Sequence, residues 1–340
     1  MSSIGSRSVL GKCVASVQKG GQYLLAQKNS NGLIGKDFNV FCKVPLALYA
    51  AGFEKDARQQ LEAIRNVAFR DDEINSIYLL GKKDWHYASC YYGWMALAAS
   101  RLGDTETSRN FGRRMLDFQD EAFGGFYSIS EPEERRVMHV VHTSICGVVC
   151  IRLGELQRAR RAADFIIRLL RLQPSTSKLY YRIYANGNLA TDYPVDTRKK
   201  RQRYAVVGKA LWFLSELHKA TGEAAYRTHA EEAFRFGISC QKDLYSRLAS
   251  VMFAWGSAKL YTITSEESQK SVAERIALNV AGNQRKDGSW ANPWILNELD
   301  SPFSFDDFYR AMMHTESFNL DRTAEATIAI GGVAEELSSK

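Results

Sequence analysis

The chain has 340 residues, with 45 Lys and Arg against 38 Asp and Glu and a formal net charge of +7. Hydrophobic residues make up 45% and charged residues 24%, which is ordinary globular usage and excludes a mainly disordered chain. No apolar run approaches the ~18 residues of a membrane span, and the dispersed basic charge gives no nucleic-acid-binding pattern. Six cysteines are too few for a disulfide scaffold, so a reducing, cytoplasmic location is expected.

Two kinds of apolar pattern alternate along the chain. Segments with one charged face are typical of surface helices, and segments that are apolar all round are typical of buried ones. The surface type covers 8–27, 55–70, 104–120, 155–173, 223–241 and 266–284. The buried type covers 37–52, 84–102, 136–153, 203–221, 243–263 and 313–337. This alternation predicts an all-α (α/α)6 toroid, six outer helices around six inner ones, as a single domain over residues 1–340.

Long connections precede the buried segments, whereas the connections that follow them are short. The long ones are 28–36, 71–83, 121–135, 174–202 and 285–312, and within them 179–185 is a candidate short β element. Long loops in compact domains are commonly functional, so we expect the site at the N-terminal ends of the inner helices. Unpaired N–H groups and the helix dipole favour an anionic substrate group there.

Glutamine followed by a glycine turn recurs at the ends of surface helices. In "NQRKDGSW", Gln284, Gly288 and Trp290 match the Gln-x-x-x-Gly-x-Trp core of the QW repeat, and "FQDEAFGGF" is similar to the Gly-Gly-Phe repeat. The chain thus resembles the squalene–hopene cyclase and protein prenyltransferase β-subunit superfamily, which implies a terpenoid cyclase-like toroid. Its usual catalytic motifs, the Asp-x-Asp-Asp acid motif and the zinc ligands, are not recognisable here. We expect Gln284 and Trp290 to be structural.

Four of the six histidines fall near predicted N-terminal ends of inner helices. His86 follows Asp84 closely, and His314 is followed by Glu316. Histidine titrates near neutral pH, and a nearby carboxylate can fix its tautomer and raise its pKa. We therefore predict that His86, His314, Glu316 and Asp84 are catalytic and move protons.

Other residues at these helix starts are candidate substrate contacts. They are Asp37, Trp85, Tyr87, His139, His142, Phe318 and Arg322. His139, His142 and Cys146 are spaced to share one helical face, but no second Cys/His cluster accompanies them, so no metal is expected. No phosphate loop or dinucleotide fingerprint occurs, so no cofactor is expected either.

These features predict a cofactor-independent enzyme with a small-molecule substrate in a central cavity. The reaction would be cyclisation, isomerisation or elimination by His/carboxylate chemistry on a largely apolar, anionic substrate of terpenoid or polyketide type. One alternative is a carbohydrate-active toroid, such as an epimerase, lyase or unsaturated-uronide hydrolase. Such enzymes use the same cavity, aromatic side chains that stack on sugars, and His/carboxylate chemistry. Another is a non-catalytic binding protein built from a helical repeat. The oligomeric state stays open.

Overall fold

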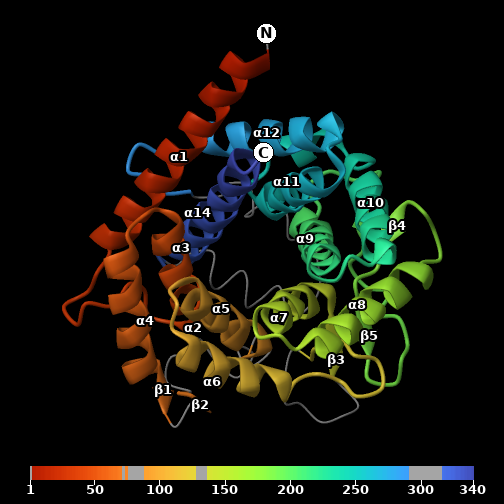
Figure 1. The fold of residues 1–340 in the computed structure, drawn as a ribbon, viewed down its shortest axis with the longest axis horizontal. Helices are drawn as coiled ribbons and strands as arrows, with labels where there is room; N and C mark the ends of the chain where they lie inside the picture. The colour runs from red at the N-terminus through yellow and green to blue at the C-terminus, as the bar shows by residue number, and fades with distance from the viewer. Residues whose placement is uncertain (1, 71–72, 76–87, 128–135, 291–315) are drawn as a thin grey trace.

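A computed structural model of the chain describes residues 2–70, 73–75, 88–127, 136–290 and 316–340, and its helices form two concentric rings (Figure 1). The outer ring holds α1 (Ser2–Ala26), α4 (Glu54–Ala68), α6 (Thr105–Leu116), α8 (Leu156–Arg171), α10 (Ala224–Ile238) and α12 (Glu267–Gly282). The inner ring holds α2 (Phe38–Phe41) with α3 (Val44–Ala50), α5 (Ala88–Arg101), α7 (Val140–Arg152), α9 (Tyr204–Thr221), α11 (Val251–Thr264) and α14 (Glu316–Ser338). Each inner helix packs on the next, and α14 packs on α3, which closes the ring. The predicted all-α toroid is confirmed.

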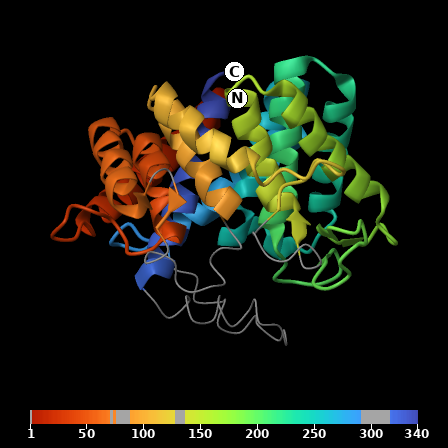
Figure 2. The same cartoon turned by 90° about the horizontal axis from the view of Figure 1, so that it is seen from below.

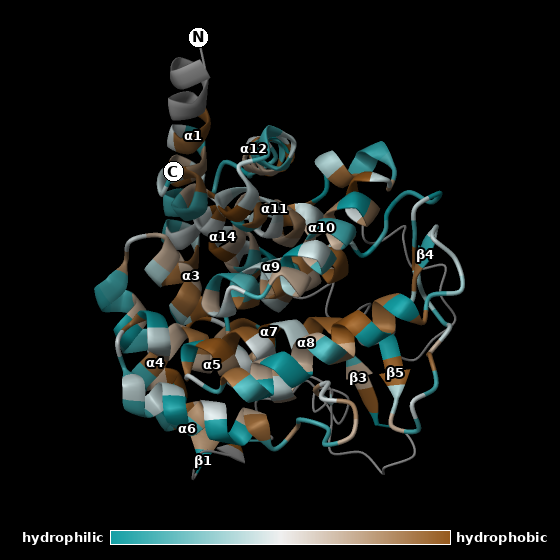
Figure 3. Ribbon diagram, turned by 45° about the vertical axis from the view of Figure 1, so that its right-hand side comes forward, coloured by the Kyte–Doolittle hydropathy of each residue, from teal (hydrophilic) through white to brown (hydrophobic). Residues whose placement is uncertain are grey.

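Burial explains why the helices sort into two rings. In α8, the buried residues recur on one face and the arginines occupy the other, so this helix covers the core from outside. In α11, every residue from Val251 to Leu260 is buried, because outer helices cover one side and the ring interior the other. Figure 3 shows the same division, with hydrophilic residues gathered on the outward faces. Among the described helices, none combines the length and apolar character needed to cross a membrane.

Three inner segments begin differently from the prediction. The expected helix 37–52 is divided into α2 and α3, because Pro45 lacks an N–H and is accommodated in the first turn of α3. The segment 243–263 becomes helical only at Val251, after the 3-10 turns Lys242–Tyr245 (η4) and Leu248–Ser250 (η5). Ahead of α7, the residues form a strand, β3 (Val137–His139), which pairs with β5 (Arg182–Tyr184).

Short strands decorate the connections of the ring. β5 (Arg182–Tyr184) lies in the segment predicted to form a β element, and β4 (Lys178–Leu179) pairs with β6 (Val195–Asp196) beside it. A further pair joins β1 (Phe69–Arg70) to β2 (Glu73–Ile74). All three pairs are antiparallel and two-stranded, so the described strands add no sheet layer to the helical ring.

The first Gln–Gly repeat fastens a turn to the next outer helix. Gln119 Nε2 donates to the carbonyl oxygens of Gly124 at 3.0 Å and of Arg158, in α8, at 2.9 Å. Gly124 has a φ of 76°, and a Cβ there would lie 2.4 Å from the carbonyl oxygen of Arg161. The turn therefore requires glycine both for its conformation and for its approach to α8.

The second repeat makes the same contacts with a different helix. Gln284 Nε2 donates to the carbonyl oxygens of Gly288 and of Ser16, in α1, each at 2.9 Å. Gly288 has a φ of 91°, and a Cβ there would lie 2.4 Å from the carbonyl oxygen of Lys19. The motif thus joins consecutive outer helices, and here it closes the outer ring between α12 and α1.

Trp290 completes this joint on the inner side. Its indole Nε1 donates to the Val280 carbonyl of α12 at 2.8 Å, and its backbone N–H donates to Thr323 Oγ1 of α14 at 3.0 Å. The side chain is 2% exposed. Trp290 therefore links an outer helix to the next inner helix, which is the structural role expected for it.

Candidate active site

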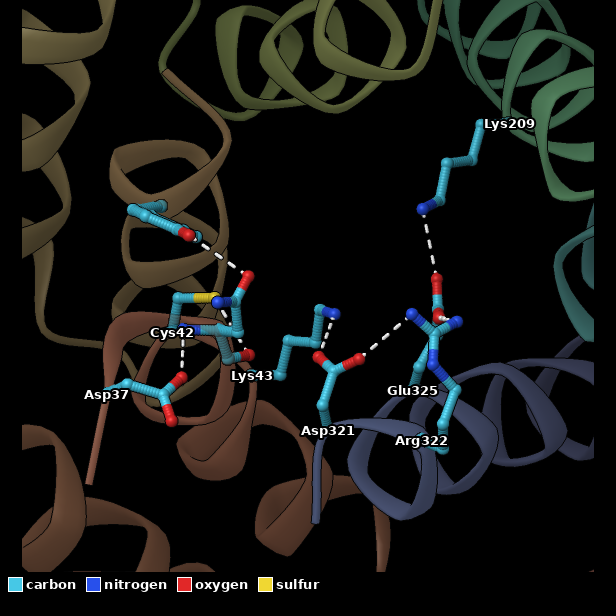
Figure 4. A network of polar contacts seen from close by, with 9 residues as sticks. Asp37, Cys42, Lys43, Lys209, Asp321, Arg322 and Glu325 are labelled. Atoms are coloured by element: carbon cyan, nitrogen blue, oxygen red, sulfur yellow. Dashed lines mark hydrogen bonds and ion pairs between the residues drawn. The ribbon is translucent and has the colours of Figure 1, made fainter. Parts of the chain in front are cut away.

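All inner helices begin at the same end of the ring, because each follows an outer helix that runs the opposite way (Figure 2). We call this end the N-terminal mouth. Inside the ring, within the first three turns of the inner helices, charged side chains form a central ion-pair network (Figure 4). The network consists of Lys43, Lys209, Asp321, Arg322 and Glu325. Buried charges persist only when they are paired and hydrogen-bonded, so the contacts within this group matter.

The network runs across the ring from one helix to another. Lys43, between α2 and α3, donates to Asp321 of α14. Asp321 lies 3.0 Å from Arg322, whose Nη1 lies 2.9 Å from the Glu325 carboxylate. Glu325 also accepts from Lys209 Nζ of α9 at 3.0 Å, and both of these side chains are under 10% exposed. Five charges from three parts of the inner ring therefore hold one another in fixed positions.

The electrostatics of the network keep Glu325 and Lys43 ionised. Burial alone would raise the pKa of Glu325, but the cations Lys209, Lys43 and Arg322 outweigh it and hold that pKa below its usual value of 4.5. Burial would likewise lower the pKa of Lys43, but the carboxylates of Asp321 and Glu325 raise it above its usual value. Both groups therefore carry their charge at neutral pH.

Asp37 is a buried carboxyl group whose pKa is raised, whereas that of Glu325 is lowered. It caps α2, and its Oδ1 accepts from the backbone N–H of Asn39 at 3.0 Å. Burial raises its pKa, the nearby Ser317 hydroxyl lowers it, and the Asp321 carboxylate raises it further, with a net increase over the usual 3.8. The Asn39 side chain is held in turn by the Tyr91 hydroxyl at 3.0 Å. Asp37 is thus better placed to hold a proton than Glu325 is.

His139 has a fixed protonation state at the start of α7. Its Nδ1 accepts from the backbone N–H of Val141 at 2.9 Å, so the neutral ring carries its proton on Nε2. The ring stacks on His142, with centroids 5.1 Å apart, and lies 4.9 Å from the Tyr181 ring. Burial holds the pKa of His139 well below its usual 6.5. His139 is therefore a neutral Nε2–H donor at physiological pH.

Several basic side chains lie near His139, and two of them, Arg182 and Lys209, are paired with the carboxylates of Asp192 and Glu325. After burial, the causes that lower its pKa are the charges of His142, Arg182, Arg203 and Lys209. Arg203 donates to the Tyr181 hydroxyl at 3.1 Å, which fixes the guanidinium beside the histidine pair. Cations gathered in a low-dielectric site attract an anionic group. This agrees with the anionic substrate group expected at helix N-termini.

The structure describes five of the predicted binding residues. Asp37, His139, His142, Phe318 and Arg322 all lie at or near the first turns of α2, α7 and α14, and the Arg322 guanidinium covers the Phe318 ring at 5.2 Å. Asp84, Trp85, His86, Tyr87 and His314 lie outside the described residues. Glu316 is the first residue of α14, and its side chain is not described. The catalytic assignment to His86, His314, Glu316 and Asp84 therefore stays a prediction.

Sequence reasoning missed three members of the network, namely Lys43, Lys209 and Glu325. Each stands alone as a charged residue in an apolar segment, "VFCKVPL", "VVGKALW" and "TAEATIAI". A charge inside a helix that is apolar all round needs a buried partner, and this was the available signal.

The face shared by His139, His142 and Cys146, for which no metal is expected, is fully buried at its cysteine. Burial raises the pKa of the Cys146 thiol well above its usual 9.0, and its Sγ contacts the Ser89 carbonyl oxygen at 3.5 Å. Among the described residues, no three His, Cys, Asp or Glu side chains are placed to hold a metal ion together.

Solved structures of similar shape carry the same toroid. The chain superimposes on a D-mannose isomerase with a TM-score of 0.68 and 11% identity, over 96% of this chain and 97% of that chain. For a GH76 α-mannanase from Bacteroides thetaiotaomicron the TM-score is 0.65 and the identity 12%, over 95% of this chain and 96% of that chain. For an unsaturated glucuronyl hydrolase specific for heparin the TM-score is 0.65 and the identity 10%, over 98% of both chains. No protein-family model and no curated protein sequence matches the chain.

These comparisons correct the family suggested by the sequence motifs. The similar structures are an isomerase of mannose, mannanases and glucuronyl hydrolases, so the resemblance to squalene–hopene cyclases and prenyltransferase β subunits is wrong. The physical reason lies in the role of Gln119 and Gln284. Their side chains join a turn to the next outer helix, which is a requirement of the ring geometry and independent of the reaction inside it. The terpenoid or polyketide-like substrate loses its support with that family.

Proposed function

We propose that this chain is a carbohydrate-active enzyme that binds an acidic saccharide at the N-terminal mouth and acts on it by acid–base chemistry. The observation that carries the proposal is the central ion-pair network. An apolar polyene would leave these charges facing hydrocarbon, which is unfavourable, whereas sugar hydroxyls can both donate to carboxylates and accept from ammonium and guanidinium groups.

The acidic character of the substrate follows from the charges around His139. Lys209, Arg182 and Arg203 all act on this histidine, and its Nε2–H is a fixed donor. A uronate carboxylate would accept from Nε2–H while its charge is stabilised by these cations. The similar structures include an unsaturated glucuronyl hydrolase, and this likeness of fold supports the same substrate class.

Acid–base roles follow from the two carboxyl groups with diverging pKa values. Asp37, whose pKa is raised, is the proton donor, and Glu325, whose pKa is lowered, stays ionised and stabilises developing positive charge. Diverging pKa values in one site are typical of acid and base pairs in enzymes. His139 would position the substrate, because protonating its Nδ1 would break the Val141 hydrogen bond that starts α7.

An isomerase of a free neutral sugar is the second candidate. The ring of His142 stacked on His139 favours it, because one imidazole can move a proton between two carbon atoms of a sugar chain while His139 donates from Nε2 to a sugar oxygen. The similar D-mannose isomerase supports this candidate through its fold alone.

The test is a substrate panel with a conservative variant. Turnover of saturated and unsaturated uronate disaccharides, and isomerisation of free mannose, would be measured for the unmodified chain, Asp37→Asn and Asp104→Asn. Asparagine is a good helix cap, so Asp37→Asn keeps the contact with Asn39 and removes only the acid. Asp104 caps α6 through Thr107 at 3.0 Å and serves as the matched control on an outer helix.

We expect Asp37→Asn to reduce turnover of a uronate disaccharide by about 10²–10⁴, as loss of a general acid does, and Asp104→Asn to keep it. Turnover of mannose alone would favour the isomerase. Full activity of Asp37→Asn would refute the assignment of the acid, and saccharide binding without turnover would favour a binding protein.

A further inference from the structure

A cavity of about 280 Å³ lies inside the inner ring toward the opposite end from the N-terminal mouth. We call it the axial cavity. All six inner helical positions contribute to it. The residues from last turns include Tyr49 of α3, Arg101 of α5, Arg152 of α7 and Glu335 of α14. The side chains of Glu335, Arg152 and Arg101 are 56%, 38% and 31% exposed, so the cavity reaches solvent. The end of the chain lies at this end of the ring (Figure 2).

Two tryptophans form an apolar wall of the axial cavity. The rings of Trp212 in α9 and Trp255 in α11 lie 4.6 Å apart at 31°, and both side chains are buried. Trp255 lies directly against α14 at Gly332, where a Cβ would come within 2.3 Å of the indole. Leu97 and Val148 continue the apolar lining. The wall is therefore well packed against α14.

Paired charges form the rim. Arg101 binds both oxygens of Glu335, at 2.9 and 3.2 Å, across the α5–α14 gap. Arg152 Nη2 lies 3.4 Å from both oxygens of Glu216, whose carboxylate is also 2.9 Å from Lys259 Nζ. The Nε and Nη1 groups of Arg152 make no hydrogen bond to the described residues, which leaves donors available at the cavity.

The charge balance at this end differs from that at the N-terminal mouth. Two arginines and two glutamates line the axial cavity, so their formal charges cancel. The C-terminal ends of the inner helices are partially negative and disfavour an anion, and Arg101 and Arg152 in the last turns offset that effect. A strongly charged ligand of either sign therefore gains little here.

We propose that the axial cavity is a second saccharide site, which takes a single uncharged sugar ring. Hydroxyl groups would donate to Glu216 and Glu335 and accept from the available N–H groups of Arg152. The C–H face of the ring would pack on the apolar wall around Trp255. Pockets for drug-sized ligands measure about 300–1,000 Å³, so a cavity of about 280 Å³ fits one ring better than an oligosaccharide.

The experiment measures binding alone, so it is independent of turnover and of the proposed function. Saturation-transfer NMR and tryptophan fluorescence would be recorded with three probes: methyl α-mannoside, methyl α-glucoside and cyclohexanol. The Asp37→Asn variant would serve as the background in which catalysis is reduced. Arg152→Met removes the rim donors at similar volume, and Arg160→Met is the matched control. Arg160 is 33% exposed and ion-paired to Glu223 on the outer surface.

We expect a methyl glycoside to bind and change the tryptophan fluorescence, Arg152→Met to weaken that binding by about tenfold or more, and Arg160→Met to leave it unchanged. A second variant, Ala50→Leu, places a larger side chain in the cavity lining and should block the glycoside without removing a charge. Absence of glycoside binding would overturn the proposal. Equal binding of cyclohexanol would also overturn it, because it would show an unspecific apolar cavity. Glycoside binding that is lost in Arg322→Met but retained in Arg152→Met would overturn it too, because the sugar would then lie at the N-terminal mouth.

Discussion

Removing the carboxylate of Glu325 tests whether the central ion-pair network acts as a unit. In Glu325→Gln, Lys209 loses the anion 3.0 Å from its ammonium group, and Arg322 loses a partner at 2.9 Å. The Lys209 side chain is 8% exposed, so water replaces little of the lost interaction. Breaking a buried ion pair by removing one partner costs about 3–5 kcal/mol. Because Arg322 keeps its contact with Asp321, we expect a loss of about 3 kcal/mol in the free energy of unfolding.

The assay is urea denaturation followed by circular dichroism, with two comparison variants. Glu54→Gln breaks an exposed pair with Arg58, whose side chains are 57% and 52% exposed, and should cost under about 1 kcal/mol. The double variant Lys209→Met/Glu325→Leu removes both buried charges. Its loss in the free energy of unfolding should be smaller than the summed losses of Lys209→Met and Glu325→Leu. A loss below about 1 kcal/mol in Glu325→Gln, or strict additivity in the double variant, would refute the coupling.

The pH dependence gives an independent check on the same residue. The folded pKa of Glu325 lies below 4.5, so its stabilisation is complete above the unfolded pKa and is lost as pH falls through the folded value. The stability difference between the unmodified chain and Glu325→Gln should therefore shrink in acid. A difference that stays constant as the pH falls would contradict the lowered pKa.

Three further predictions concern the ring and the histidine pair. The pKa of His139 in the folded chain lies below its unfolded value of 6.5, so the unmodified chain should lose stability as the pH falls below 6.5. Asparagine can still cap α7, so His139→Asn should reduce this dependence of the free energy of unfolding on pH, as measured in denaturation curves. Trp290→Ala should lower the free energy of unfolding by about 3–5 kcal/mol, and a smaller change would show that the joint between α12 and α14 does not depend on the indole. Gly288→Ala should be more destabilising than Gly222→Ala, because both glycines have positive φ but only Gly288 meets a carbonyl oxygen; equal melting temperatures would contradict the steric argument.

The helical ring was predictable because the apolar periodicity and the glycines after helices are local signals. The exceptions were local too, since Pro45 divides one inner helix and 3-10 turns delay the start of α11. The places of Asp37, His139 and His142 at the starts of α2 and α7 were predictable from the same local signals. The pairing of Lys209 with Glu325 was not, because these residues are 116 positions apart and only the closed ring brings them together. The family was misjudged because Gln284, Gly288 and Trp290 serve the ring geometry, which unrelated toroids can share.

The central claim is that the cations at the N-terminal mouth select an acidic saccharide. Its most direct test is calorimetric binding of a glucuronate disaccharide and of its neutral methyl ester to the Asp37→Asn chain, with and without Lys209→Met. We expect the acid to bind at least about tenfold more tightly than the ester, a difference of about 1.4 kcal/mol, and the preference to fall with Lys209→Met and with added salt. Equal affinity for the acid and the ester, unchanged by Lys209→Met, would contradict the account.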